Sequence, residues 1–479
     1  MRLRTFLIWV SSLFIAGCSL LDPSKEPGVR ESIIQPAECA LLTGDDIRFH
    51  IAAVYGFEQA LKFPGMLVGI DKTHANAVHD KAEGSLKLDP DRPAWIDKEL
   101  VKPKNKLTFI SLVAHTVPGN DIYAKPAPVD TIFNAYSQDA PKKVKSSGGK
   151  SASECGYATY EDFDHETGWR AIAGIRDTLK ADLDAGHYTH VFVIVMGWNT
   201  QQAESIQNFN SIVGSLVAKA PDKNFRPYVI GVTWPSEWDN AWIAQRAIQP
   251  TSLVTKGQDA TEIGAGWLGA VFDHAVLPTM YRREEKLIVI GHSYGARATS
   301  YAVCKGSALR APFKDGPRAT VDTLIGLEGA YSIGAYDKEG SLETNIKYEV
   351  DCPRADRLIF TSSIHDTAAD AAGIIDRFEF AGAHATYEDV RNNPRFGGRD
   401  HGFVVSAWQA TDSHGSIKLA DGPNSHPDGY FCFVDASQVI FYNAPNSGAG
   451  AHSDIYRPET ANMLWNLMDA KNCKARPRT

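Results

Sequence analysis

The sequence lacks the marks of a nucleic-acid-binding, zinc-binding or repeat protein. Its 49 Lys and Arg are outnumbered by 57 Asp and Glu, and no long basic tract is present, which argues against nucleic acid as a partner. Only seven of the 479 residues are Cys, none in a Cys-x-x-Cys pair or at a Cys/His ligand spacing, so no metal site is indicated. No internal repeat is present, which argues against a repeat architecture.

The N-terminal segment has the pattern of a targeting signal. Arg2 and Arg4 precede an apolar stretch over residues 5–15, which is too short for a stable membrane span. The stretch ends in Ile15-Ala16-Gly17-Cys18, which resembles the lipobox of bacterial lipoproteins. That resemblance implies a signal peptide over residues 1–17 and acylation of Cys18. The alternative is an ordinary secreted protein with an incidental cysteine.

The segments that follow Cys18 suggest how the chain is divided. Residues 18–38 are polar and contain three prolines, which predicts a tether between membrane and domain. The second residue of the mature chain would be Ser19, which by the sorting habit of lipoproteins favours the periplasmic face of the outer membrane. Residues 39–105 have a mixed pattern and are expected to form an N-terminal cap of unassigned role. The main domain is expected over residues 106–470.

Six cysteines remain when Cys18 is set aside: Cys39, Cys155, Cys304, Cys352, Cys432 and Cys473. In an oxidising compartment this even number permits up to three disulfides, whose connectivity is not readable from the sequence. Cys304 has an alternative role as a small buried apolar residue.

Short apolar runs alternate with segments of helical spacing along the main domain. This order predicts an α/β fold with a mostly parallel central sheet, helices on both faces and loop insertions, and it places ligands at the carboxyl ends of the strands. Strands are expected over residues 107–114, 191–195, 228–234, 287–290, 321–327, 358–362 and 437–442. Helices are expected over residues 169–183, 203–218, 263–281, 296–303 and 458–469.

The most informative motif is Gly291-His292-Ser293-Tyr294-Gly295. It has the form Gly-x-Ser-x-Gly and stands between a β-branched apolar run and a segment suited to a helix. A strand, a sharp turn and a helix are the context that lifts a serine out of a sheet as a nucleophile. The alternative is a glycine-rich turn of another α/β fold.

A nucleophilic serine needs a base, usually a histidine that is oriented by a carboxylate. Asp366 follows the expected strand 358–362 and is the preferred acid, although it could instead cap a helix that begins at Thr367. Glu328, at the end of the preceding strand, is the rival acid, and Asp370 is a more distant one. The preferred base is His452, which lies in a glycine-rich loop before the last helix. Three alternatives lie in a polar stretch between the last two expected strands: His401, His414 and His426.

Two backbone amides are expected to stabilise a developing oxyanion. One belongs to Tyr294, the residue after the nucleophile. The other is expected from the loop after strand 191–195, where Trp198 is the preferred donor. The Trp198 side chain also suits an apolar wall of an acyl pocket.

Taken together, the motif at 291–296, Gly197-Trp198-Asn199, Thr233-Trp234-Pro235-Ser236 and His452-Ser453-Asp454 resemble the α/β-hydrolase superfamily of lipase and esterase type. The resemblance covers roughly residues 107–467. It departs from a related bacterial group at Met196 and Trp198, where His and Tyr are usual.

The resemblance implies a cofactor-free serine hydrolase that cleaves carboxylic esters, with a small ester or lipid as substrate. Thioester, amide and peptide substrates remain open because the triad serves all of them. The alternative is an inactive member of the fold that binds or scaffolds in the cell envelope. An insertion at about residues 391–429 is expected to line or cover the entrance.

Overall fold

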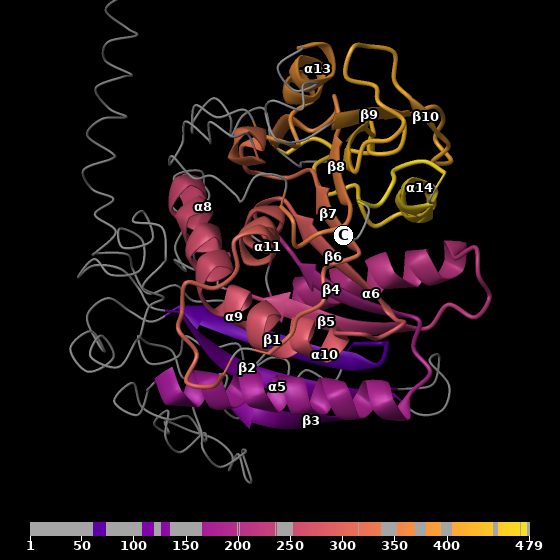
Figure 1. Cartoon of the computed structure of the whole chain (residues 1–479). Coiled ribbons are helices and arrows are strands. Elements are labelled where there is room, and N and C mark those ends of the chain that lie inside the picture. Colours follow the sequence, from indigo (N-terminus) through magenta and orange to yellow (C-terminus); the bar gives the residue numbers. More distant parts are fainter. Residues whose placement is uncertain are drawn as a thin grey trace, which may run out of the picture.

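In the computed structural model, the chain has an α/β fold with helices packed around one continuous sheet (Figure 1). The structure describes residues 61–72, 108–118, 126–134, 165–198, 200, 202–234, 236, 252–314, 316–336, 352–368, 380–393, 405–443, 449–469 and 471–476. The signal peptide, the acylated Cys18 and the tether predicted from the sequence lie outside these residues, as do Cys39 and Cys155.

The sheet has 11 strands in the order β10-β9-β11-β8-β7-β6-β4-β5-β1-β2-β3. From β9 to β1 in this order, neighbouring strands are parallel, whereas β10, β2 and β3 are attached antiparallel. The strands are β1 (Gly65–Lys72), β2 (Thr108–Pro118), β3 (Pro126–Asn134), β4 (His190–Val195), β5 (Pro227–Thr233), β6 (Lys286–His292), β7 (Thr323–Leu327), β8 (Leu358–Ser362), β9 (Val405–Ala410), β10 (Ile417–Leu419) and β11 (Phe431–Asp435).

Helices cover both faces of the sheet, as expected for a mostly parallel one. One face carries the helices α5 (His165–Ala185), α8 (Ser252–Ile263), α11 (Tyr294–Cys304) and α13 (His384–Asn392). The same face carries the run that continues α8 through η6 (Gly264–Leu268), α9 (Gly269–Val271), η7 (Phe272–Val276) and α10 (Leu277–Met280). The opposite face carries α6 (Gln202–Lys219) and α14 (Pro458–Met468) (Figure 1).

The core consists of two apolar layers, one on each side of the sheet. Strand β4 contributes side chains to both layers. Val191, Val193 and Val195 belong to one layer, and Phe192 and Ile194 belong to the other. A strand buried on both faces has no polar alternation, which is why residues 191–195 were recognisable as a central strand.

Several expected elements are confirmed within a few residues of their bounds. They are the strands β2, β4, β5, β6, β7 and β8 and the helices α5, α6, α11 and α14. The expected helix over residues 263–281 is present as a run of α and π turns.

The sheet begins earlier in the chain than expected. Strand β1 lies within residues 39–105, where a cap was expected, yet it pairs parallel with β5 and antiparallel with β2. Residues 65–72 therefore belong to the sheet and not to a separate cap. Strand β3 also replaces part of an expected loop. Its Pro126 and Pro128 suit an edge strand, which is where β3 lies.

The C-terminal part of the sheet differs most from expectation. The strand expected over residues 437–442 is wrong, since residues 437–439 form a turn in which the Val439 and Ile440 amides both donate to the Ala436 carbonyl. The last strand of the sheet is β11 instead. Strands β9 and β10 lie inside the predicted insertion 391–429, so its described part extends the sheet and does not form one long covering loop.

Two disulfides join distant parts of the chain. Cys304 at the end of α11 is bonded to Cys352, and Cys432 of β11 is bonded to Cys473. The alternative role of Cys304 as a free apolar residue is therefore wrong. Among the described residues, no helix is long and apolar enough to cross a membrane.

Candidate active site

Ser293 occupies a strained turn between β6 and α11. Its φ of 53° and ψ of −123° lie in a region that residues with a side chain rarely adopt. Backbone hydrogen bonds fix the turn: the Ser293 amide donates to the Leu327 carbonyl at 3.0 Å, and the Ala296 amide donates to the Ser293 carbonyl at 3.0 Å. A strained backbone that its surroundings hold in place is typical of functional sites.

The two glycines of the motif are required by close packing. A Cβ on Gly291 would lie 2.4 Å from Cα of Ala296, and one on Gly295 would lie 2.2 Å from the Val195 carbonyl oxygen. Both contacts are with backbone, which has little freedom to move away. The glycines thus let α11 start directly against the ends of β6 and β4, which gives the strand-turn-helix geometry expected from the sequence.

Asp366 and His452 lie side by side, which is the contact expected from the sequence. His452 Nδ1 lies 2.7 Å from Asp366 Oδ2, and the Asp366 side chain is fully buried. The other oxygen, Oδ1, accepts the Ala368 amide at 3.0 Å, so Asp366 does cap the helix that begins at Thr367. The Asp366 carboxylate therefore caps the helix and also fixes the orientation of the His452 imidazole.

The loops that carry this pair are joined through their backbones. Asp366 forms an antiparallel bridge with Gly450, and the Ala451 amide donates to the His365 carbonyl at 2.8 Å. Gly450 has a φ of 62°, and a Cβ there would lie 2.3 Å from the same carbonyl oxygen. The glycine-rich sequence before His452 is thus what allows the two loops to meet.

The loop after β4 lies against the serine. A Cβ on Gly197 would be 2.4 Å from Ser293 Cβ and 3.0 Å from Ser293 Oγ. Trp234 holds this loop by donating its indole N–H to the Met196 carbonyl at 2.8 Å. Reciprocal hydrogen bonds between Thr200 and Ser236 add a second attachment. The segment 233–236 is therefore a support for the loop that carries Trp198.

His292 is a site residue that the sequence did not single out. Its Nε2 lies 2.9 Å from the His452 carbonyl oxygen, and the two imidazole centroids are 4.8 Å apart. A carbonyl only accepts, so Nε2 carries the proton, while Nδ1 is buried without a hydrogen-bond partner. Burial and the neighbouring His452 lower the pKa of His292 to about 3. Its place directly before Ser293 was the available signal.

Glu328, the rival acid, is present at the site but does not contact His452 in the manner of Asp366. It directly follows β7 and is fully buried. Burial, followed by repulsion from Asp366, raises its pKa well above the ordinary value. The carboxyl groups of Glu328 and Asp366 therefore differ in their hydrogen bonds.

The alternative histidines are placed elsewhere. His414 is exposed in the turn between β9 and β10, where its amide donates to Asp412 Oδ1. His426 lies in the connection from β10 to β11. His401 and Asp370 lie outside the described residues, as does Asn199.

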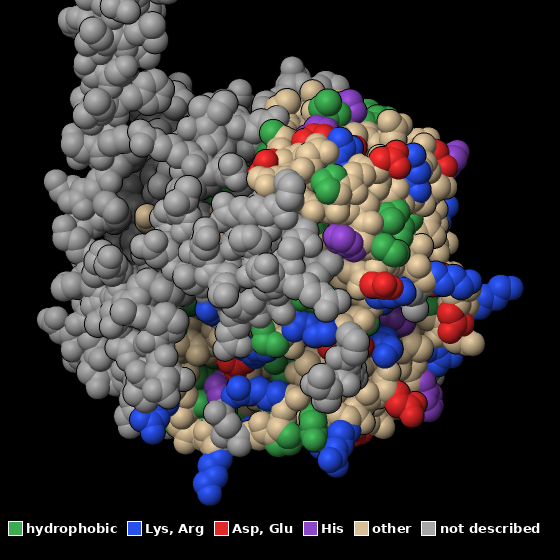
Figure 2. All heavy atoms as spheres, turned by 45° about the horizontal axis from the view of Figure 1, so that its top comes forward, with side chains coloured by type: hydrophobic (Ala, Val, Ile, Leu, Met, Phe, Trp, Pro, Cys, Tyr) green, Lys and Arg blue, Asp and Glu red, His purple; other side chains and the backbone are tan. Residues whose placement is uncertain are grey.

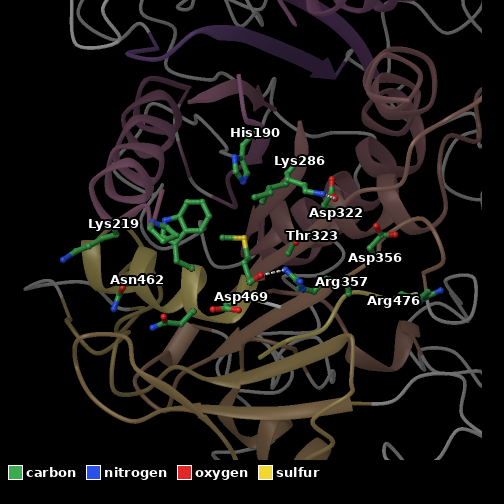
Figure 3. Close-up of a pocket in the computed structure, with 16 residues that line it drawn as sticks. His190, Lys219, Lys286, Asp322, Thr323, Asp356, Arg357, Asn462, Asp469 and Arg476 are labelled. Atoms are coloured by element: carbon green, nitrogen blue, oxygen red, sulfur yellow. Dashed lines mark hydrogen bonds and ion pairs between the residues drawn. The ribbon is translucent and has the colours of Figure 1, made fainter. Parts of the chain in front are cut away.

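A cavity of about 530 Å³ lies at the opposite, amino-terminal edge of the sheet (Figure 3). His190, Lys286 and Thr323 line it from the first residues of β4, β6 and β7. Two of the cations that line it have partners on the protein, since Lys286 pairs with Asp322 and Arg357 donates to the Met468 carbonyl. This cavity does not include the serine, the acid or the base.

The described part of the chain contains no cluster of three or more His, Cys, Asp or Glu side chains that could hold a metal ion. On the face shown in Figure 2, acidic and basic side chains are interspersed over the described surface. No family of known proteins, no curated protein and no solved structure matches the chain.

Proposed function

We propose that this protein is a serine hydrolase of the α/β-hydrolase fold that cleaves carboxylic esters. The observation that carries the proposal is the contact between His452 Nδ1 and Asp366 Oδ2, 2.7 Å apart, together with the hydrogen bond between the His452 carbonyl and His292, the residue before Ser293. Ser293 itself is held in a turn at the end of a central strand. A nucleophile, a base and an orienting acid are thereby supplied from three places in the chain.

The strand order supports the same proposal. Ser293 follows β6, the acid follows β8, and the histidine lies between β11 and α14. Strands β4, β6, β7, β8 and β11 are successive neighbours in the sheet. The parallel strands have their carboxyl ends at the same edge of the sheet, which is where ligands bind in such folds. The order of the three residues along the chain, serine, acid and histidine, is the order found in α/β-hydrolases.

The proposed reaction proceeds through an acyl-enzyme. Ser293 Oγ attacks the ester carbonyl carbon while His452 accepts the hydroxyl proton, and Asp366 stabilises the imidazolium that forms. Collapse of the tetrahedral intermediate breaks the bond to the alcohol oxygen, which takes the proton from His452. Water then attacks the acyl carbon while His452 accepts its proton. The bond to Ser293 Oγ breaks, Oγ takes the proton back from His452, and the carboxylic acid leaves. No cofactor takes part.

The oxyanion of the intermediate is proposed to bind backbone amides of Tyr294 and Trp198. Tyr294 opens α11, where the helix dipole favours negative charge. Trp198 follows Gly197, whose backbone lies against Ser293. Fixed donors of this kind typically contribute about 3–4 kcal/mol to the transition state. A small ester or lipid is the proposed substrate.

A fluorophosphonate probe tests the proposal directly, because it reacts with activated serines. We expect the wild-type protein to be labelled and Ser293→Ala to be unlabelled. Ser211→Ala, an exposed serine on α6, is the matched control and should label normally. A wild type that resists the probe and hydrolyses none of a panel of short- and long-chain esters would instead support a binding or scaffolding role.

We further propose that the protein is a lipoprotein of the bacterial cell envelope, attached through Cys18 and facing the periplasm from the outer membrane. The lipobox-like residues 15–18 support the attachment. Two disulfides between described cysteines support an oxidising compartment.

A further inference from the structure

Glu328 is a second carboxyl group at the acid end of the site. It has a φ of 45°, a left-handed conformation that is uncommon for a residue with a side chain. It shares this property with Ser293, which follows the neighbouring strand of the sheet. A glycine would adopt the conformation without strain, so the side chain itself calls for an explanation.

The carboxyl group of Glu328 is sealed from solvent. Its Oε1 accepts the Thr361 hydroxyl at 3.1 Å, and its amide donates to the same hydroxyl oxygen at 3.1 Å. The whole residue is inaccessible to solvent. Gly382 packs against the Glu328 backbone, since a Cβ on Gly382 would lie 2.6 Å from the carbonyl carbon of Glu328. A fully ionised carboxylate would thus be held in a dry site by one hydroxyl donor.

The charges around Glu328 do not favour its ionisation. The ionisable groups that act on it are Asp366 and Asp435, both carboxyls, and no described cation forms an ion pair with it. The negative charge is better stabilised on Asp366, because its oxygens accept hydrogen bonds from the His452 ring N–H and from the Ala368 amide. Two neighbouring buried carboxyls rarely ionise together, so the proton belongs on Glu328.

We propose that Glu328 carries a proton and donates it in a hydrogen bond to Asp366, which makes Glu328 a positioning residue for the acid that orients His452. The proposal rests on the hydrolase function proposed above. The hydrogen bond fixes the rotamer of the Asp366 carboxylate. It also lowers the basicity of that carboxylate, so the proton taken from Ser293 stays on His452 for transfer to the leaving alcohol.

Three variants separate a neutral donor from an ionised acid. Glu328→Gln keeps a neutral N–H donor, and we expect kcat within about threefold of wild type. Glu328→Leu removes the donor, and we expect kcat to fall about 10- to 100-fold, the effect of one hydrogen bond to a charged group, with KM little changed. Glu285→Gln, the same change beside the opposite edge of the sheet, is the control and should leave both constants unchanged.

A second measurement reports the proton without relying on activity. Infrared spectra at neutral pH should show the carbonyl band of a protonated carboxyl group in wild type and Glu285→Gln, and not in Glu328→Gln. The melting temperature should also change with pH. The pKa of Glu328 is raised on folding, so its contribution is complete below about pH 4 and declines as pH rises. Glu328→Gln should lack that decline.

A Glu328→Gln variant as inactive as Asp366→Asn would overturn the proposal, because it would show that the negative charge resides on Glu328. Absence of the infrared band from wild type would overturn it as well. If the wild type neither reacts with the fluorophosphonate nor turns over esters, the hydrolase function fails, while the band and the pH dependence still decide the protonation of Glu328. Should Glu328→Leu not fold, the Gln variant and the spectra decide alone.

Discussion

Two histidines meet beside Ser293, and burial gives them different tasks. His292 is nearly inaccessible to solvent and donates to the backbone of His452. A second positive charge 4.8 Å from His452 would oppose the imidazolium that the proposed reaction forms when Ser293 loses its proton. Keeping His292 neutral removes this repulsion, and its hydrogen bond holds the His452 loop in place.

This division of tasks predicts the effect of replacing His292. His292→Leu removes the donor to a buried carbonyl, and we expect kcat to fall by about tenfold. His292→Gln keeps an N–H donor and should retain more activity. The acidic limb of the pH–rate profile should be the same in wild type and His292→Gln, because the pKa of His292, about 3, lies below the working range. A limb that moves in this variant would contradict the assignment.

The same residue predicts how stability depends on pH. An unfolded His has a pKa of about 6.5, so the unfolded chain binds a proton that folded His292 refuses. Stability should therefore fall as pH drops from about 6.5 toward 3. Denaturant titrations across this range should show a weaker pH dependence for His292→Gln.

The residues of the proposed triad could be selected from the sequence because chain order and strand ends constrain them. Ser293 is marked by its motif, Asp366 by the strand before it, and His452 by its loop before the last helix. His292 was missed because donation to the carbonyl of a residue 160 positions away is set only by tertiary structure. Glu328 was recognised as a carboxyl at the right place, but its protonation depends on burial.

At the scale of elements, the site is built where α11 and the loop after β4 meet. Gly197 and Gly295 remove the side chains that would keep them apart, and Trp234 ties the loop down from β5. A change that pushes the loop away should therefore leave the sheet intact and displace the Trp198 amide, one of the two proposed oxyanion donors.

Gly197→Ala tests this contact. Its methyl group would overlap Ser293 Cβ at 2.4 Å, and a shift of about 1 Å in catalytic geometry typically costs about 100-fold in rate. We expect a loss of this size in kcat/KM with an unchanged circular dichroism spectrum. The control is Gly214→Ala on α6, where a Cβ meets nothing within 4 Å. It should retain activity and gain about 0.5–1 kcal/mol of stability. Equal activity in both variants would count against the contact.

Elements were predictable where burial acts on both faces of a strand or one face of a helix. The run 437–442 failed because its apolar residues reach the core from a turn, with Val439 and Ile440 buried and Phe441 and Tyr442 exposed. Strand β1 was missed because its pairing depends on β5, more than 150 residues later. The hydrophobic periodicity of a segment indicates which of its residues are buried, but it does not indicate which distant strand the segment pairs with.

On the scale of the whole molecule, the two disulfides fasten the C-terminal half to the sheet. They close loops with sequence separations of 48 and 41 residues. In the chain-entropy account, each loop of this length stabilises the folded state by about 4 kcal/mol, a large share of the total for a typical protein. The folded molecule should therefore depend on the compartment in which it matures.

The proposed membrane attachment and the formation of the disulfides would both depend on export, and two changes at the N-terminus should separate them. Replacing residues 1–18 by a cleavable secretory signal peptide without a lipobox removes the proposed acylation site and keeps export. The protein should then move from the membrane to the soluble periplasmic fraction with its disulfides formed and its activity per molecule unchanged. Replacing residues 1–17 by a single Met should retain the chain in the reducing cytoplasm, with free thiols and a lower melting temperature. Fractionation, thiol alkylation followed by mass spectrometry, and thermal melts report the three properties. If the protein exported by the secretory signal peptide stayed with the membrane, the lipid attachment would be refuted and the proposed triad would be unaffected.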